Sequence, residues 1–433
     1  MTTPAAFIAR TDRTLIRAVG RSKRFVLAQV TAPAADHRRE RLPVNLAFVL
    51  DRSGSMSGEK IQLARQTIVE ALGRLDARDR FSIVAYDDVI DVVVEATAAT
   101  PDARAIALSR LGRIDARNST NLSGGWLRGA EQVAIEQLAD GVNRVLLLTD
   151  GLANAGITDA AELATHAAAL RARGVSTTTF GIGADFDEVL LQGMADAGGG
   201  HFYFVRDAAT IRDHIASEVG ETLEVVARDV EIEIVVADGV QVEALSPQPM
   251  RTRGGRTTLD VGDLVSEQVL DVVLRLTFPF GDIGRTSGAI LSLTDRDGVL
   301  AAADPAAADD ARLTWTWADH LANDDQPRDV EVDRAVATQF AARARQEAVQ
   351  RNRHGDFAGA RHVLAATAKR IREYAGRDAL MRQLVAELSA EAETFAAPMS
   401  PLMLKEAHFA GSNQSRMRST TGQALKRREP TLR

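Results

Sequence analysis

Short apolar runs alternate with amphipathic stretches from Val44 to about Gly220. The apolar runs are continuous, which is typical of strands that are buried on both faces of a parallel sheet. The stretches between them carry apolar residues three and four positions apart, the spacing of helices that cover such a sheet. The pattern predicts an α/β domain with a doubly wound, mostly parallel sheet at residues 44–220. Strands are expected at 44–51, 81–86, 90–96, 144–150, 175–183 and 201–205, and helices at 59–75, 101–111, 122–138, 159–171, 187–197 and 208–219.

The period of the apolar positions becomes two between Leu223 and about Trp317, and Gly and Pro separate the runs. Such alternation indicates antiparallel strands with one face in a core, so we expect a β-sandwich domain at residues 221–320. A further strand is predicted at residues 23–31, within an N-terminal segment that covers residues 1–43. The sandwich strands are expected at 230–236, 239–245, 257–264, 269–278 and 288–295.

Helical spacing returns at residues 329–397, where the pattern predicts a short bundle of three helices. Asp356 follows a His-Gly break between the first two of them and is placed to cap the second helix. Residues 398–433 begin with two prolines and then become rich in Ser, Thr, Gln and Arg. Because such a segment buries little apolar surface, we expect a disordered basic tail there.

Composition restricts the classes of function. Of the 433 residues, 45% are hydrophobic, which is enough for the cores of several domains. The net charge of −7 argues against nucleic-acid binding, and the absence of Cys excludes disulfides and thiolate metal sites. The N-terminus lacks the apolar core of a signal peptide, and no apolar run approaches the roughly 18 residues that span a bilayer. We therefore expect a cytoplasmic protein without a membrane span.

Oxygen-bearing side chains follow two of the predicted buried strands. Asp51 ends the strand at 44–51 and is followed by Ser53 and Ser55, and Asp150 ends a second strand. If these strands are neighbours where the strand order reverses, the side chains converge at one edge of the sheet. Thr120, in a loop before a predicted helix, could supply a third hydroxyl. Carboxylate and hydroxyl oxygens are the ligands that Mg²⁺ prefers.

The segments LDRSGSM, NSTN and LLLTDG at these positions resemble the three loops of the metal-ion-dependent adhesion site in von Willebrand factor A domains. The resemblance covers residues 44–220. It implies that the hydroxyls bind Mg²⁺ directly and that the carboxylates bind it directly or through water; Mn²⁺ or Ca²⁺ could replace Mg²⁺. The five ligand positions of the family fall on Asp51, Ser53, Ser55, Thr120 and Asp150.

The same resemblance implies that one coordination position of the ion stays open. An Asp or Glu of a partner protein would fill it, so that the binding of the partner depends on the metal. We expect a solvent-exposed rim around this position that contacts the partner. The rim residues are expected to be Arg52, Met56, Asn121 and Leu152.

The order of the predicted domains is similar to that in bacterial relatives of inter-α-trypsin-inhibitor heavy chains and of calcium-activated chloride-channel regulators. In those proteins the adhesion domain is inserted into the β-sandwich, which implies that the strand at 23–31 pairs with strands from 225–317. Bacterial relatives often work beside AAA+ ATPases of the MoxR or chelatase type. Such an ATPase is therefore a candidate partner by resemblance.

Three other interpretations of the oxygen-rich loops remain open. The residues could simply cap helices and turns, with Ser55 as a helix cap. The chain could be a metal-dependent hydrolase that uses Asp51 and Asp150, although the sequence offers no general base at a suitable spacing and few carboxylates for two-metal chemistry. It could also be a structural assembly subunit whose metal site is idle. The favoured hypothesis is a non-enzymatic, metal-dependent protein-binding protein.

Overall fold

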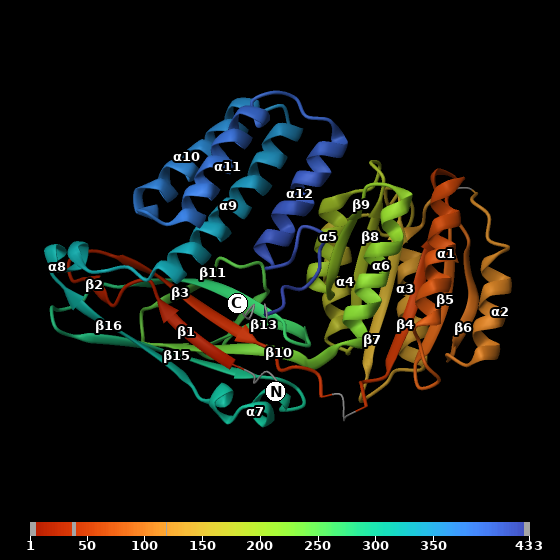
Figure 1. Ribbon diagram of the computed structural model, residues 1–433, viewed down its shortest axis with the longest axis horizontal. Helices are drawn as coiled ribbons and strands as arrows, with labels where there is room; N and C mark the ends of the chain where they lie inside the picture. The colour runs from red at the N-terminus through yellow and green to blue at the C-terminus, as the bar shows by residue number, and fades with distance from the viewer. Residues whose placement is uncertain (1–5, 37–39, 118, 428–433) are drawn as a thin grey trace, which may run out of the picture.

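The computed structural model describes residues 6–36, 40–117 and 119–427. It consists of an α/β domain, a β-sandwich and a group of C-terminal helices that lies against both (Figure 1). None of the helices in the described parts is long and apolar enough to cross a membrane. The predictions made for residues 1–5, 37–39, 118 and 428–433, including the last part of the expected tail, lie outside the described residues.

The α/β domain contains a six-stranded sheet in the order β6-β5-β4-β7-β8-β9. Every residue of the two central strands, β4 (Val44–Asp51) and β7 (Val142–Thr149), is buried, which explains their continuous apolar runs. Neighbouring strands are parallel except for β5 and β6, so the α/β fold class is confirmed. The other elements are the short 3₁₀ helix Gly54–Met56, α1 (Glu59–Gly73), β5 (Arg80–Tyr86), β6 (Ile90–Ala98), α2 (Pro101–Leu111), α3 (Leu122–Ile135), α4 (Ala160–Arg171), β8 (Ser176–Ile182), α5 (Glu188–Ala197), β9 (Gly199–Val205) and α6 (Ala208–Leu223).

The strand order of this sheet creates a crevice between β4 and β7. The chain leaves β4 through α1 to β5 on one side, and it leaves β7 through α4 to β8 on the other side. The loops at the carboxyl ends of β4 and β7 therefore diverge and leave a space between them. In open α/β sheets this is the position at which ligands bind.

The β-sandwich is built from strands that precede and follow the α/β domain. One sheet has the order β1-β3-β14-β11, and the other has the order β12-β13-β10-β15-β16-β2. The strand expected at residues 23–31 is β3, which pairs antiparallel with β14 from Ser22↔Phe278 to Thr31↔Val269. The α/β domain is thus inserted between β3 and β10. The elements are β1 (Ala6–Thr11), β2 (Leu15–Arg17), β3 (Ser22–Thr31), β10 (Val225–Val236), β11 (Gln241–Ala244), β12 (Met250–Arg253), β13 (Arg256–Val265), β14 (Val269–Phe278), β15 (Thr286–Thr294), β16 (Ala311–Ala318) and the short helices α7 (Val299–Ala303), Pro305–Ala308 and α8 (His320–Asp325).

Four helices follow the sandwich: α9 (Val330–Arg353), α10 (Phe357–Ala375), α11 (Ala379–Phe395) and α12 (Pro401–Ser415). The carboxylate of Asp356 accepts a hydrogen bond from Gly359 N, as expected of the cap of α10. At its beginning α9 packs on the sandwich, where Phe340 meets Phe25 edge to face at 5.9 Å. α12 packs between α9 and the edge strand β9 of the α/β domain (Figure 1).

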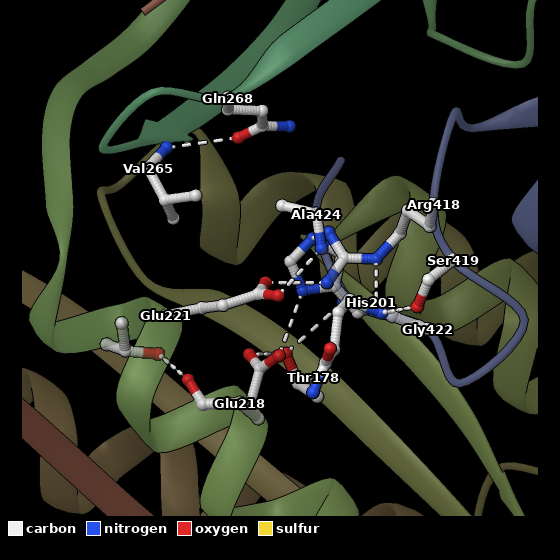
Figure 2. Close-up of polar contacts among 12 residues, drawn as sticks. Thr178, His201, Glu218, Glu221, Val265, Gln268, Arg418, Ser419, Gly422 and Ala424 are labelled. Carbon is white, nitrogen blue, oxygen red and sulfur yellow. Dashed lines mark hydrogen bonds and ion pairs between the residues drawn. The ribbon is translucent and has the colours of Figure 1, made fainter. Parts of the chain in front are cut away.

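The prediction of a disordered tail at 398–433 is wrong for residues 401–427. Besides forming α12, this segment buries Arg418 against α6 and β9. In Figure 2 the guanidinium of Arg418 lies between His201 and Glu221, at 2.9 Å from His201 Nε2 and 2.6 Å from Glu221 Oε2. The backbone N–H of Ala424 also donates to Glu221 (2.8 Å). The tail is ordered because its polar groups pair with buried carboxylates, which its low apolar content could not reveal.

We predict that Arg418→Ala lowers the free energy of unfolding by about 3 kcal/mol, because it leaves the buried carboxylate of Glu221 without its cation. Urea unfolding followed by circular dichroism measures the change, and limited proteolysis reports whether the tail detaches.

The matched control for this prediction is Lys426→Ala, which removes another ion pair of the same tail. Lys426 pairs with Glu224, but both side chains are more than 40% exposed, so the loss should stay below about 1 kcal/mol. Equal effects of the two substitutions would contradict the assigned role of Arg418.

Candidate metal centre

Three loops meet at the carboxyl ends of the central strands. Asp51 is the last residue of β4, and Asp150 directly follows β7. Because β4 and β7 pair in parallel, these two residues end neighbouring strands. Thr120 lies two residues before α3, in a loop that is tied to the loop after β7 by the hydrogen bond from its N–H to Asn154 Oδ1 (3.1 Å). The structure therefore brings together the strand-end residues and the loop residue that the sequence singled out.

Oxygen atoms of these residues lie at spacings that suit a small octahedral ion. Ser53 Oγ is 3.1 Å from Ser55 Oγ, and Ser55 Oγ is 2.7 Å from Asp150 Oδ1. Ligands about 2.1 Å from an octahedral ion are separated from their neighbours by about 3.0 Å. A methyl group added at Gly151 would lie 3.3 Å from Thr120 Oγ1 and 3.9 Å from Ser55 Oγ. The absence of a side chain at Gly151 thus leaves open a space beside the hydroxyls of Thr120 and Ser55, which come from two different loops.

The two carboxylates of the site are removed from water. Asp51 and Asp150 have no exposed surface. Burial raises the pKa of Asp51, and the neighbouring charge of Asp150 adds to the effect, while hydrogen bonds from Thr149 and Ser53 oppose it. Thr149 Oγ1 donates to Asp51 Oδ2 (2.6 Å), and Ser53 N donates to Asp51 Oδ1 (2.8 Å), so neutral donors fix its orientation. Two buried carboxylates held in this way suit a cation.

Lys60, which the sequence analysis did not single out, supplies a positive charge at this site. Its ammonium group forms an ion pair with Asp150 Oδ2 and also lies 3.3 Å from the carbonyl oxygen of Ser55. The lysine is in the first turn of α1, directly after the loop that contains Ser55. The signal that could have identified it is charge balance, since two predicted buried carboxylates call for a nearby cation.

Two of the four predicted rim residues are not at the surface, so the prediction is wrong for them. Met56 has no exposed surface, and Arg52 is 6% exposed. The guanidinium of Arg52 points into the domain, where it donates to Asp87 (3.1 Å) and to Asp91 (2.5 Å). Arg52 therefore anchors the loop after β4 to the neighbouring hairpin and cannot contact a partner without breaking these pairs.

The other two rim residues differ in their availability. Leu152 is 55% exposed and lies two residues beyond Asp150. The side chain of Asn121 caps α3 by accepting a hydrogen bond from Gly124 N (3.0 Å). A partner that approaches the loops would therefore meet Leu152 as a free apolar side chain and Asn121 as an occupied helix cap.

A second cluster of possible ligands comes from the edge strand β9 and from α6, next to Arg418 of the tail. His201, Glu218 and Glu221 each offer one ligand atom within 4.8 Å of the others. However, Glu218 is paired with Arg144 (2.7 Å) and Glu221 with Arg418 (2.6 Å). Burial opposes ionisation of Glu218, but the charges of His201 and Arg144 hold its pKa well below the usual range. The guanidinium groups of Arg144 and Arg418 already neutralise both carboxylates, so this cluster is an internal ion-pair network and does not fit a metal ion. Figure 2 shows Arg418 beside Glu221 and His201.

Comparisons with known proteins agree with this architecture. The chain is 28% identical over 259 residues to the Escherichia coli (strain K12) protein YfbK, a match that covers 58% of this chain and 45% of YfbK. It is 30% identical over 190 residues to inter-alpha-trypsin inhibitor heavy chain H4 of Sus scrofa, covering 42% of this chain and 20% of that protein. The chain thus spans less than half the length of these two relatives.

Solved structures share the whole arrangement of domains. A von Willebrand factor type A protein from Catenulispora acidiphila superposes with a TM-score of 0.69 at 18% identity, covering 98% of each chain. The ArnB paralog VWA2 from Sulfolobus acidocaldarius superposes with a TM-score of 0.58 at 14% identity, covering 95% of this chain and 99% of that one. At these identities the likeness concerns the fold.

A family model for the von Willebrand factor type A domain matches residues 45–217. These residues correspond closely to the α/β domain, which is inserted in the sequence between strands β3 and β10 of the β-sandwich. Sequence match, sheet order and structural neighbours agree on this part of the chain. The protein therefore contains a von Willebrand factor type A domain and is similar, over part of its length, to YfbK and to inter-alpha-trypsin inhibitor heavy chain H4.

Proposed function

We propose that the chain is a protein-binding protein whose type A domain captures a carboxylate of its partner through a bound Mg²⁺ ion. The observation that carries this proposal is the spacing of oxygens from Ser53, Ser55 and Asp150, which corresponds to the edges of an octahedral shell. The proposed ligands of the ion are Asp51, Ser53, Ser55, Thr120 and Asp150.

The hydroxyl and carboxylate ligands have different roles in this proposal. The three hydroxyls offer neutral oxygens, while Asp51 and Asp150 balance the two positive charges of the ion. When bound, the ion supplies an open coordination position that attracts an Asp or Glu side chain of the partner. Since Mn²⁺ and Ca²⁺ also take oxygen ligands, the identity of the ion depends on its supply and on the rigidity of the loops.

Lys60 has to move for this function. Its ammonium group is bound to Asp150, which is also a proposed metal ligand. Lys60 and the ion therefore compete for one carboxylate, and the lysine stabilises the domain when the ion is absent. Because Lys60 is 31% exposed, its flexible side chain can release Asp150 and turn to solvent without disturbing the core.

The chemistry of the partner follows from that of the site. It is a protein that presents an exposed Asp or Glu, and an AAA+ ATPase of the MoxR type is one candidate that rests on the resemblance of this chain to bacterial relatives. The proposal assigns no catalytic role to Asp51 or Asp150, so Mg²⁺ should not confer phosphate-ester hydrolysis on the chain.

We predict that Mg²⁺ raises the melting temperature of the protein, because it binds only the folded chain; at a hundredfold excess over Kd the stabilisation is about 2.7 kcal/mol. Asp51→Asn should remove this increment. In chelator the same variant should melt above the wild type, because it replaces a buried carboxylate that has no cation of its own with a neutral amide. Differential scanning calorimetry with Mg²⁺ and with EDTA measures both effects.

The control for Asp51→Asn is Asp282→Asn, which changes an exposed Asp in the loop between β14 and β15. It should keep the full Mg²⁺ increment. An increment that persists in Asp51→Asn would place the metal elsewhere in the chain.

We also predict that Thr120→Ala lowers the Mg²⁺-dependent capture of partner proteins at least tenfold and leaves the fold intact. Thr120 is buried but lies in a loop outside the sheet, so the substitution removes one oxygen of the proposed shell and a single methyl group. The measurement is a pull-down from cell lysate on the immobilised protein, in Mg²⁺ and in EDTA.

Ser119→Ala is the matched control for Thr120→Ala, since this hydroxyl belongs to an exposed neighbour in the same loop. It should leave capture unchanged. If proteins that need Mg²⁺ for capture bind Thr120→Ala as well as the wild type, the assigned ligand set is wrong.

A further inference from the structure

A groove of about 580 Å³ separates the type A domain from the C-terminal helices. Its walls are mainly apolar and come from two parts of the chain that lie far apart in the sequence. The type A domain contributes the loops after β7 and β8, and the helical part contributes the α9–α10 turn and the beginning of α12. The apolar lining residues include Leu152, Ala184, Phe186, Phe357, Met399 and Leu404.

The groove borders directly on the proposed metal site. Leu152, on its wall, follows Asp150 by two residues, and an extended chain of that length spans at most about 7 Å. On the β8 side, a methyl group added at Gly183 would lie 3.5 Å from Lys60 Nζ, and the next residue, Ala184, lines the groove. The loop after β7 therefore carries both the proposed ligand Asp150 and the groove residue Leu152, while the loop after β8 lies between Lys60 and the groove.

The charged side chains of the groove balance one another. Glu188 is buried there and is shared by Arg353 and by Lys405, whose Nζ lies 2.6 Å from Glu188 Oε2. Asp187 adds a second carboxylate, which caps α5 by accepting hydrogen bonds from neutral backbone N–H groups. Two cations are thus matched by two carboxylates, and the rest of the lining is mainly apolar. A large apolar side chain complements such a wall, because its burial removes apolar surface from water on both sides.

We propose that this groove receives a large apolar side chain from the same partner segment whose Asp or Glu reaches the metal. This inference rests on the proposed function and adds a description of the partner sequence to it. The partner presents an acidic residue and, about two to four residues away, a Leu, Ile, Met or Phe. Burial of such a side chain strengthens binding roughly ten- to hundredfold.

The test uses the full chain and a displayed library of random twelve-residue peptides, selected in Mg²⁺ with parallel selection in EDTA. Enriched peptides should contain the acidic residue and the apolar residue at a fixed spacing. Their affinities are then measured by fluorescence anisotropy for the wild type and for variants. Phe357→Ser and Met399→Ser change half-buried groove residues, and each should weaken binding at least tenfold while the melting temperature shows that the fold persists.

Two controls separate the groove from the metal site. Phe280→Ser changes an apolar residue that is 65% exposed on a sandwich loop, and it should not alter the affinity. Ser55→Ala removes a proposed metal ligand and should abolish binding together with its dependence on Mg²⁺.

Each alternative outcome overturns a specific statement. Mg²⁺-dependent peptides that bind Phe357→Ser and Met399→Ser with full affinity would refute the groove and leave the proposed function intact. Peptides that need the groove but bind equally in EDTA would refute the link between groove and metal. A selection that enriches nothing in Mg²⁺ over EDTA would contradict both the inference and the proposed function.

Discussion

The placement of two carboxylates at the ends of neighbouring buried strands is the constraint on which the rest of this molecule depends. Because β4 and β7 pair in parallel at the centre of the sheet, Asp51 and Asp150 end side by side without exposed surface. Neither carboxylate can reach water without distorting the sheet, so a nearby cation is needed to compensate for its lost hydration. In the described structure Lys60 provides one positive charge, and the hydroxyls around Asp150 belong to the donor set that we propose for a divalent ion.

The insertion into the sandwich determines which end of the central strands is covered and which end stays open. The sandwich contacts the end of the domain at which β7 begins: Arg228 donates to the carbonyl oxygen of Gly141 (2.9 Å), just before Val142. The carboxyl ends of the strands therefore point away from the sandwich. α12 and the tail reach back to the edge of the sheet, where Arg418 pairs with Glu221, and the beginning of α12 lines a groove together with the loop after β7. The inserted domain is thereby fixed by the sandwich at one end and by the C-terminal segment at the sheet edge.

The sequence was most informative where one physical requirement dominates. Continuous apolar runs predicted β4 and β7, because a strand that is buried on both faces is apolar throughout. Alternating apolar and polar residues predicted β14, because one face of that strand lies in the core of the sandwich. The pattern failed for residues 401–427, whose order comes from polar contacts with distant residues such as Glu221. The sequence pattern also failed for the expected rim residue Arg52. An arginine beside an oxygen-rich loop is expected to be exposed, yet Arg52 is buried because it forms ion pairs with Asp87 and Asp91 of the neighbouring hairpin. Long-range ion pairs leave no local period.

A metal ion alone is a poor discriminator between partners. It attracts any exposed carboxylate, and most proteins present many of these. Selectivity requires a second feature that a wrong partner cannot satisfy, since specificity is a difference between affinities. In this chain the groove that Leu152 and Met399 line adjoins the loop that carries Asp150, one of the ligands that we propose. In the proposed function the C-terminal helices therefore do more than support the fold, because the groove lets a site that recognises charge also recognise shape.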